Sequence, residues 1–335
     1  MGKAHIFVTG ATGLVGTRFC RVALEHGYDV TALVRKGSSR DSLAGLNLQF
    51  FEGDLSNPTG LTEALGEADY VVHAAAHIGD WGPAETYRAI NVESLRTMLG
   101  IASQCERLRR WIHVSSLGVY PAQHHYGTDE NAPTDLVGLD GYTRTKAEAE
   151  LVVQEFVREK HFPAVILRPG FIYGPGERYA IPRVIKRLHA GQLKIIGRGD
   201  KVLNNTYVGN FTDAILLAIE APDSVQGEIY NIRDGRLVTR TEYLHTISKF
   251  FGKPDPKHVP LWVAKCLAGP IESLAKLRGA TEPPLLTGAT MKFMTRNLDF
   301  SIEKAKRDLG YEPRVDFQEG MSETLEAFQT QQQPA

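Results

Sequence analysis

Short apolar runs alternate with amphipathic segments through the first half of the chain. Within the runs apolar residues occupy consecutive positions, as in strands that are buried on both faces of a parallel sheet. The segments between them repeat apolar residues every three or four positions, which is typical of helices that cover such a sheet. The predicted strands are 6–9, 30–34, 48–52, 70–74, 110–115 and 164–168, and the predicted helices are 14–25, 60–65, 84–105 and 142–159.

The alternation of strands and helices predicts right-handed βαβ units, and hence a Rossmann-type, doubly wound parallel sheet of the α/β class. After about residue 170 the elements are shorter, and prolines interrupt the chain between 254 and 260. We therefore expect a Rossmann domain over residues 1–170, to which some later segments return, and a smaller C-terminal lobe over 171–335. In this second part we expect short elements over 182–189, 194–196, 211–220, 228–232 and 241–251, and a helix over 261–277.

The predicted helix over 261–277 has an apolar stripe that allows two interpretations. It could be a packed helix of the small lobe, or a lid or helix that touches a membrane surface. Lys265, Glu272 and the Gly269-Pro270 pair interrupt the stripe, so we favour the packed helix. The stripe consists of Leu261, Trp262, Leu267, Ile271 and Leu274.

The composition is that of a globular protein and argues against several other classes. Hydrophobic residues make up 42% of the 335 residues and charged residues 23%, close to globular averages. The formal net charge of −1 provides no basic field that would attract nucleic acid. No apolar stretch reaches the ~20 residues of a membrane span. The strand-like N-terminus leaves no room for a signal peptide.

The cysteines and histidines give no sign of a disulfide framework or a metal site. Cys20, Cys105 and Cys266 are odd in number and lack paired spacing. His124 and His125 have no carboxylate or thiol partner at ligand spacing, so we expect no metal. These features favour a soluble protein of a reducing, cytoplasmic compartment.

Three glycines at regular spacing follow the first predicted strand. Gly10 permits a tight turn, Gly13 lets the backbone approach a pyrophosphate, and Gly16 lets the next helix pack closely on the sheet. The N-terminus of that helix would face the phosphates with free N–H groups. In a strand–turn–helix context this motif predicts a dinucleotide site, although a tight turn without a ligand is the alternative. The predicted contacts here are Gly10, Thr12, Gly13, Leu14, Val15 and Gly16.

Two cations at the end of the second strand bear on the choice of dinucleotide. An NAD site usually has an acid at this point for the ribose hydroxyls, whereas this chain has Arg35 and Lys36. Cations suit a 2′-phosphate through charge-assisted hydrogen bonds, so we expect a preference for NADP(H). The alternative is that both are ordinary exposed charges beside an NAD(H) site.

Further cofactor contacts are expected where the third and fourth strands end. Asp54, followed by Leu55, could accept a hydrogen bond from an adenine amino group, or could equally be a helix N-cap or turn residue. Small side chains after the fourth strand would let the backbone approach the cofactor. They are Ala74, Ala75 and Ala76.

Tyr142 and Lys146 open a predicted helix and project from one face of it. A free tyrosine has a pKa near ~10, too high for a base at neutral pH, and a nearby ammonium would lower it. The same tyrosine could donate a proton in a reduction. Ser116, at the end of the fifth strand, is placed to hydrogen-bond a substrate oxygen. A surface tyrosine and lysine without function are the alternative.

With these motifs in order, the sequence resembles the extended short-chain dehydrogenases/reductases of the NAD-dependent epimerase/dehydratase superfamily. The resemblance implies a Ser116–Tyr142–Lys146 triad. It also implies that Pro169 and Ile172 line the nicotinamide, and that Asn91 supports the cofactor site from a neighbouring helix. By resemblance we expect a homodimer through helices 84–105 and 142–159. The matching motifs are 10–16, 54–55, 73–76, 91–92, 115–116, 142–146 and 168–175.

The branch of that family indicates a bulky, largely apolar substrate. Residues 79–83 and 258–264 resemble the 3β-hydroxysteroid dehydrogenase and dihydroflavonol-reductase-like branch, whose members act on sterols, flavonoids and β-keto acids. Relatives that act on sugar nucleotides usually carry an Asn in place of Phe171. The expected pocket wall could bury an apolar substrate, although core packing is the commoner role of single aromatic residues. It consists of Ile78, Trp81, Tyr120, Phe171 and Tyr179.

Together these patterns predict an NAD(P)-dependent oxidoreductase that interconverts a secondary alcohol and a ketone. One alternative is a sugar-nucleotide epimerase or dehydratase that retains NAD. A weaker alternative is a regulatory protein that senses NADP(H) without turnover, because such proteins commonly lose the Tyr–Lys pair.

Overall fold

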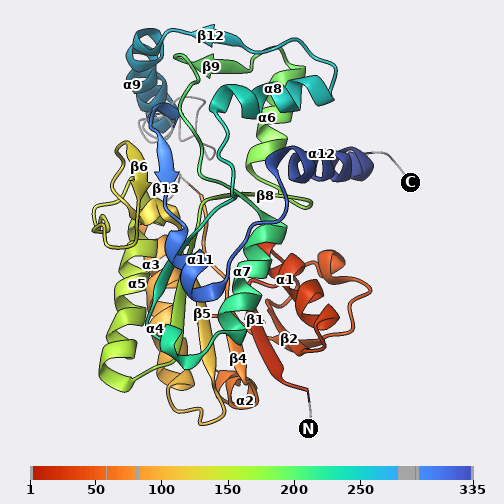
Figure 1. Cartoon of the computed structure of the whole chain (residues 1–335), viewed down its shortest axis with the longest axis vertical. Coiled ribbons are helices and arrows are strands. Elements are labelled where there is room, and N and C mark those ends of the chain that lie inside the picture. Colours follow the sequence, from red (N-terminus) through yellow and green to blue (C-terminus); the bar gives the residue numbers. More distant parts are fainter. Residues whose placement is uncertain (1–2, 58, 80–82, 278–290, 292–293, 333–335) are drawn as a thin grey trace.

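The computed structural model describes residues 3–57, 59–79, 83–277, 291 and 294–332. It consists of two parts (Figure 1). A seven-stranded sheet with helices on both faces forms the lower part of the view, and a smaller lobe covers its upper edge. The strand order is β11-β7-β5-β4-β1-β2-β3, and every pair is parallel. The strands are β1 (His5–Thr9), β2 (Asp29–Val34), β3 (Gln49–Glu52), β4 (Tyr70–His73), β5 (Arg110–Val114), β7 (Ala164–Pro169) and β11 (Ile229–Ile232).

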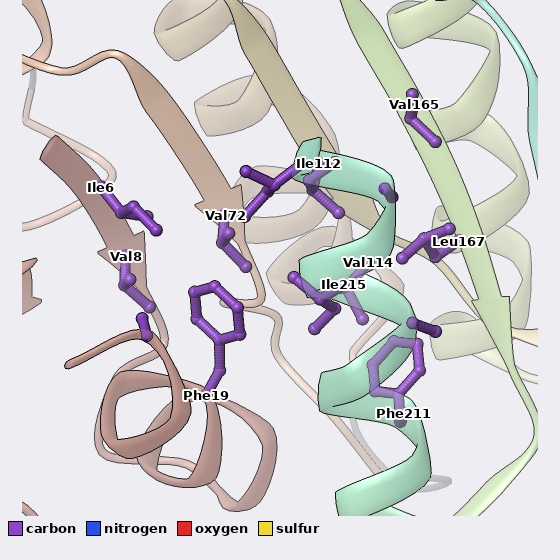
Figure 2. Close-up of a cluster of buried hydrophobic side chains, with 14 of the residues drawn as sticks. Ile6, Val8, Phe19, Val72, Ile112, Val114, Val165, Leu167, Phe211 and Ile215 are labelled. Atoms are coloured by element: carbon purple, nitrogen blue, oxygen red, sulfur yellow. The ribbon is translucent and has the colours of Figure 1, made fainter. Parts of the chain in front are cut away.

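Alternate side chains of each strand point to opposite faces of the sheet, and both faces are apolar. On one face, Phe19 of α1 (Leu14–Glu25) and Phe211 of α7 (Val208–Glu220) pack against the sheet (Figure 2). Burial on both faces explains why the strands read as continuous apolar runs. The opposite face is covered by α2 (Leu61–Gly66), α4 (Ser94–Ala102) and α5 (Gly141–Lys160).

The predicted doubly wound sheet is confirmed. Each of the six strands predicted in the first half is present, with ends that differ by at most one residue. The chain builds β1, β2 and β3 in one direction and then returns to place β4, β5 and β7 on the other side of β1. The order therefore reverses between β1 and β4, and in such sheets a ligand crevice forms at the carboxyl ends of those strands.

Three later elements return to the Rossmann domain after the chain has entered the lobe. The helix α7 packs against α1, and β11 pairs with β7 at the edge of the sheet. The helix α11 (Glu303–Leu309) then packs on β11. The chain thus passes between the two parts several times, through α7, β11 and α11.

The lobe is built from helices and short parallel strand pairs around its own core. The helices are α6 (Ala180–His189), α8 (Arg240–Phe250), α9 (Leu261–Leu277) and α12 (Phe317–Gln332). The pairs are β8 (Phe171–Tyr173) with β10 (Asn205–Tyr207), β9 (Lys194–Ile196) with β12 (Lys257–Val259), and β6 (His125–Thr128) with β13 (Leu298–Phe300). Of these elements, β6, β8, β10, β12, β13 and α12 were not predicted from the sequence.

The helix predicted over 84–105 is interrupted in the structure. The helix α3 (Ala84–Arg88) is followed by a π-helical turn, η2 (Ala89–Glu93), and only then by α4. A π-helical turn adds a residue to the turn, and such turns often lie at functional sites. The polar side chain of Asn91 stands within this turn and is buried, which an ideal apolar periodicity does not anticipate.

The helix predicted over 261–277 is present, but of its predicted stripe only Leu261 packs against the buried cluster of α9. Ala264 and Ala268 make the buried contacts of α9 with the lobe. Trp262, Leu267 and Leu274, which belong to the predicted stripe, are exposed. Small residues at the contact let the helix approach closely, so the larger apolar side chains remain on the outer surface. No helix among the described residues is long and apolar enough to cross a membrane.

A buried ion pair joins α5 to β7 beneath the carboxyl edge of the sheet. Arg168 donates two hydrogen bonds to the carboxylate of Glu150, with distances of 2.9 and 2.6 Å, and each side chain is only 2% exposed. Ser115 donates to the same carboxylate at 2.5 Å, and the Tyr120 hydroxyl accepts from Arg168 at 2.7 Å. Both charges are therefore compensated, as burial of a charge requires.

We expect Glu150→Gln to lower the free energy of unfolding by ~3–5 kcal/mol, because it leaves the buried guanidinium of Arg168 without its charge partner. Urea unfolding followed by circular dichroism measures the change. Glu155→Gln is the matched control on the same helix, since its partner Arg96 is 45% exposed, and it should cost ~1 kcal/mol or less. Equal losses in the two variants would contradict this account of the buried pair.

Candidate active site

A cleft of about 1590 Å³ follows the carboxyl edge of the sheet and continues between the sheet and the lobe. Its lower wall comes from the turn between β1 and α1 and from the ends of β4 and β5. The rest of the cleft is lined by the first turn of α5, the segment from β7 to β8 and one side of α6. Most of the residues predicted to bind a cofactor or substrate line this one cleft.

The glycine turn has the shape of a phosphate cradle. Gly10 has a φ of +70°, and a Cβ there would lie 2.7 Å from the backbone nitrogen of Ala75. A Cβ on Gly16 would lie 2.2 Å from the carbonyl oxygen of Gly10, so the helix α1 can pack here only without a side chain. A Cβ on Gly13 meets one protein atom at 3.2 Å, the Gly10 oxygen, and Gly13 lines the cleft at the N-terminus of α1. The backbone N–H groups at this N-terminus of α1 could bind an anionic phosphate.

The end of β4 is held against this turn. The hydroxyl of Thr9 accepts a hydrogen bond from the backbone nitrogen of Ala75 at 3.2 Å and lies 3.0 Å from Nδ1 of His73. Ala74, Ala75 and Ala76 all line the cleft. The small side chains after β4 therefore have two effects. They allow the close contact with Gly10, and they leave the cleft open at this point.

The charged residues predicted to bind the cofactor after the second and third strands differ in whether they line the cleft. Arg35 lines the cleft, whereas Lys36 does not. Asp54 and Leu55 also line it. Asp54 accepts hydrogen bonds from the backbone nitrogen and hydroxyl of Ser56, at 2.8 and 2.6 Å. These bonds, with a smaller contribution from Arg35, hold the pKa of Asp54 below its usual value. Asp54 is thus a turn residue that also faces the cleft, so the two interpretations of it are compatible.

Asn91 lies behind the cleft wall rather than on it. Its amide oxygen accepts from the backbone nitrogen of His77 at 2.7 Å. Its amide nitrogen donates to the carbonyl of His77 at 3.1 Å and to the hydroxyl of Thr145 at 3.0 Å. The side chain therefore joins the segment after β4 to the first turns of α5. In this position Asn91 fixes the backbone around the site and does not line it.

A capping box fixes the first turn of α5. The backbone nitrogen of Thr143 donates to the Asp140 carboxylate at 2.8 Å, and the backbone nitrogen of Asp140 donates to the Thr143 hydroxyl at 3.1 Å. Such reciprocal bonds satisfy N–H groups that have no partner within the helix. Tyr142 lies inside this turn, so the hydrogen bonds of the capping box help to fix its position, in addition to side-chain packing.

Ser116, Tyr142 and Lys146 come together at the end of β5. Ser116 hydrogen-bonds the Tyr142 side chain, and its own hydroxyl accepts from the backbone nitrogen of Gly118 at 3.0 Å. The ammonium of Lys146 lies 5.9 Å from the centre of the Tyr142 ring. It donates to the carbonyl of Val114 at 2.7 Å, and only 3% of the residue is exposed.

Burial dominates the protonation of this trio. It raises the pKa of Tyr142 to about 12, although the hydrogen bond with Ser116 works against the shift. Burial also lowers the pKa of Lys146 to about 8, although Glu150 favours the charged form. Burial, and not the ammonium, therefore sets the direction of the Tyr142 pKa shift, so the predicted net lowering of this pKa is wrong. At neutral pH Tyr142 holds its proton, which suits a proton donor.

The segment after β7 brings the lobe close to Ser116, Tyr142 and Lys146. Pro169 and Ile172 line the cleft. A Cβ on Gly170, which lies between these two residues in the sequence, would be 1.8 Å from the carbonyl oxygen of Asn204. The segments that contain Gly170 and Asn204 therefore touch through their backbones. Phe171 lines the cleft beside them and packs edge-on against Tyr243 of α8, with ring centres 6.1 Å apart.

The predicted substrate wall is divided between rim and interior. Ile78 and Tyr179 line the cleft with 44% and 58% of their surface exposed. Tyr120 also lines it, but the side chain is 4% exposed and its hydroxyl donates to Asn231 at 2.9 Å. Tyr120 therefore belongs to the base of the wall, as a packed residue. Trp81 lies outside the described residues.

Two polar residues of the cleft were missed from the sequence. The amide oxygen of Asn204 and Nε of Arg296 are buried and have no hydrogen-bond partner among the residues that the structure describes. Both residues line the cleft. Neither stands in a recognisable motif, because each reaches the site through the folding of the lobe. Within the described ranges, no group of His, Cys, Asp or Glu side chains could hold a metal ion.

The family model described as "NAD dependent epimerase/dehydratase family" matches residues 6–232. The chain is 30% identical to the 2-alkyl-3-oxoalkanoate reductase of Shewanella oneidensis, over 95% of this chain and 84% of the relative. It is also 30% identical to the decarboxylating sterol-4-alpha-carboxylate 3-dehydrogenase of Saccharomyces cerevisiae, over 96% of each chain. Among solved structures, UDP-glucuronic acid 4-epimerase from Bacillus cereus in complex with NAD shares the fold. Its TM-score is 0.77 at 23% identity, over 98% of this chain and 100% of that one.

The glycine turn allows a direct test of cofactor binding. We expect Gly13→Ala to weaken the binding of a nicotinamide dinucleotide by ~10-fold or more, because its methyl group would project toward the phosphates. The loss of a glycine N-cap costs ~1 kcal/mol, so the melting temperature should fall by only roughly 2 °C. Fluorescence titration and thermal unfolding measure the two effects.

Gly16→Ala is the comparison for this variant, since its Cβ would clash with the Gly10 backbone at 2.2 Å. It should lose stability and dinucleotide binding together. Full affinity in Gly13→Ala would show that the dinucleotide does not use this turn.

Proposed function

The chain belongs to the NAD dependent epimerase/dehydratase family, and we propose that it interconverts a secondary alcohol and a ketone on a bulky, largely apolar substrate. The observation that carries this proposal is the meeting of Ser116, Tyr142 and Lys146 beside the glycine cradle in one cleft. A protonated phenol, a hydroxyl and a buried ammonium are the groups that a carbonyl reduction needs.

In this proposal a bound nicotinamide cofactor supplies the hydride for reduction or accepts it in oxidation. Tyr142 donates its proton to the carbonyl oxygen, and Ser116 hydrogen-bonds the same oxygen. Lys146 provides positive charge that stabilises the phenolate left behind. The Val114 carbonyl and the capping box of α5 fix the positions of these groups before the substrate arrives. Such preorganisation reduces the reorientation needed in the transition state.

The protonation of Tyr142 supports reduction as the direction for which the free enzyme is prepared. With its pKa raised to about 12, the phenol is protonated across the neutral range. For oxidation, Tyr142 would first have to lose that proton, and the adjacent ammonium of Lys146 favours this loss.

The relatives support an apolar substrate that contains a ketone or a secondary alcohol. One is named a reductase of 2-alkyl-3-oxoalkanoates and another a sterol-4-alpha-carboxylate 3-dehydrogenase. The exposed side chains of Ile78 and Tyr179 at the cleft, with Phe171 deeper, offer apolar surface for such a molecule. We propose a β-keto acid or sterol-type substrate, with flavonoids as the third class to be tested.

We further propose that NADP(H) is the preferred cofactor. Arg35 lines the cleft and is exposed, so its guanidinium is available for a 2′-phosphate. Arg40 instead pairs with Glu52 at 2.9 Å and lies over the Phe50 ring. Lys36 does not line the cleft, so Arg35 is the residue that supports this preference. The homodimer and the cytoplasmic location expected from the sequence stay predictions.

Tyr142→Phe tests the reaction. It should reduce turnover by at least ~1000-fold, because the hydroxyl that exchanges the proton is absent. Cofactor affinity should stay within about threefold, since the ring and the glycine turn are retained. The measurement is NADPH oxidation with a panel of β-keto acids, sterol ketones and flavonoids. Turnover close to that of the unchanged enzyme would refute the role of Tyr142. Activity on sugar nucleotides with retained NAD would instead support an epimerase.

Arg35→Asp tests the cofactor preference. Removing the guanidinium and adding an acid should weaken NADPH binding by ~100-fold while NADH binding improves, since an acid can accept from the ribose hydroxyls. Titration of nicotinamide fluorescence gives both constants. Lys36→Asp is the matched control, because Lys36 does not line the cleft, and it should change either affinity by less than about threefold. If NADH binds more tightly before any substitution, the proposed NADP(H) preference is wrong.

A further inference from the structure

The helix α6 presents two different faces to its surroundings. Ile181, Ile185 and Leu188 pack into the core of the lobe. The cleft face mixes small apolar side chains with cations, in steps of three and four residues along the helix. It consists of Ala180, Arg183, Val184, Lys186, Arg187 and Ala190.

The cations of this face have no carboxylate partner among the described residues. Arg183 and Lys186 are exposed, whereas Arg187 is half-buried. Burial, and then the neighbouring charge of Arg183, hold the pKa of Arg187 below its usual value. A half-buried guanidinium beside a like charge is unfavourable unless an anion compensates it.

The acid that could have neutralised this face is used elsewhere. The carboxylate of Glu177 accepts hydrogen bonds from the backbone nitrogens of Tyr179, Ala180 and Ile181, at 2.7, 2.9 and 2.8 Å. It therefore satisfies the N-terminus of α6 and is not paired with the arginines. Arg296 adds a further cation to the lobe side of the cleft, and its buried Nε has no partner in the described part of the chain.

The position of Arg187 along α6 separates it from the cofactor end of the cleft. The loop that leads into α6 comes close to the start of α1, since a Cβ on Gly176 would lie 3.9 Å from the Leu14 side chain. With a rise of 1.5 Å per residue, Arg187 stands roughly 10 Å further along the axis than Ala180. Ala180, Val184 and Ala190 provide apolar contacts along this path.

We propose that the cleft face of α6 binds an anionic group of the substrate, a carboxylate or a phosphate, through Arg187 and Arg183. The apolar body of the substrate then lies along Val184 toward the catalytic trio. This inference rests on the proposed function, because it assigns a charge to the substrate of that same site. It adds an anionic group at the end of the substrate remote from the reacting carbon, distinct from any carboxylate that lies beside the ketone.

Binding of simple amphiphiles to the protein saturated with NADPH tests this inference without any turnover. Decanoate, decyl phosphate and 1-decanol share one alkyl chain and differ in the head group. Calorimetry should show both anions binding at least ten times more tightly than the alcohol, and 0.5 M NaCl should weaken the anions alone. The more tightly bound anion identifies the head group. Equal affinity of the alcohol and the two anions would overturn the proposal.

Arg187→Gln assigns the effect to α6. It should weaken both anions about tenfold and leave 1-decanol and NADPH unchanged, and removing a charge beside Arg183 should not lower the melting temperature. Arg198→Gln is the matched control, since this side chain is 89% exposed and lies outside the cleft. An equal loss of NADPH affinity in Arg187→Gln would assign the cation to the cofactor and overturn the proposal. Because no hydride is transferred, a failed Tyr142→Phe test would not affect this result.

Discussion

The buried ion pair between Glu150 and Arg168 is the constraint on which the site depends. Glu150 stands one helical turn after Lys146, and Arg168 directly precedes Pro169. Ser115, which donates to Glu150, directly precedes Ser116. One carboxylate therefore fixes the three backbone segments that carry Ser116 and Lys146, the proposed catalytic residues, and Pro169, which is predicted to line the nicotinamide. The same carboxylate offsets part of the cost of burying the Lys146 ammonium.

Local patterns predicted the sheet and most of the residues that the structure brings together in the cleft. The glycine turn, the Tyr142–Lys146 spacing and the apolar strands are each contained in a short stretch of sequence, so their physical meaning can be read before the fold is known. Asn204 and Arg296 could not be found in this way, because they meet the cleft only after the lobe has folded. The pKa of Tyr142 was misjudged for the same reason: the ammonium is visible in the sequence, whereas the burial that outweighs it is not.

The small lobe was harder to predict because its order comes from many distant contacts. Its strands are three or four residues long and pair with partners far along the chain, such as β6 with β13. Such short strands lack the periodicity that identifies longer ones. The outward stripe of α9 shows a further limit. Apolar periodicity predicted a helix there, but the contact with the lobe is made by Ala264 and Ala268 together with only one stripe residue, Leu261.

The return of β11 to the edge of the sheet has a consequence for how the chain folds. Until residue 232 has been synthesised, β7 would present its free edge, with unpaired N–H and C=O groups, to solvent. The face of the sheet beside α1 would also be open, because α7 covers it only after residue 208. An unfinished sheet of this kind can pair with other chains. We therefore expect the nascent protein to pass through an aggregation-prone stage during synthesis, and this stage would end when α7 and β11 have joined the sheet.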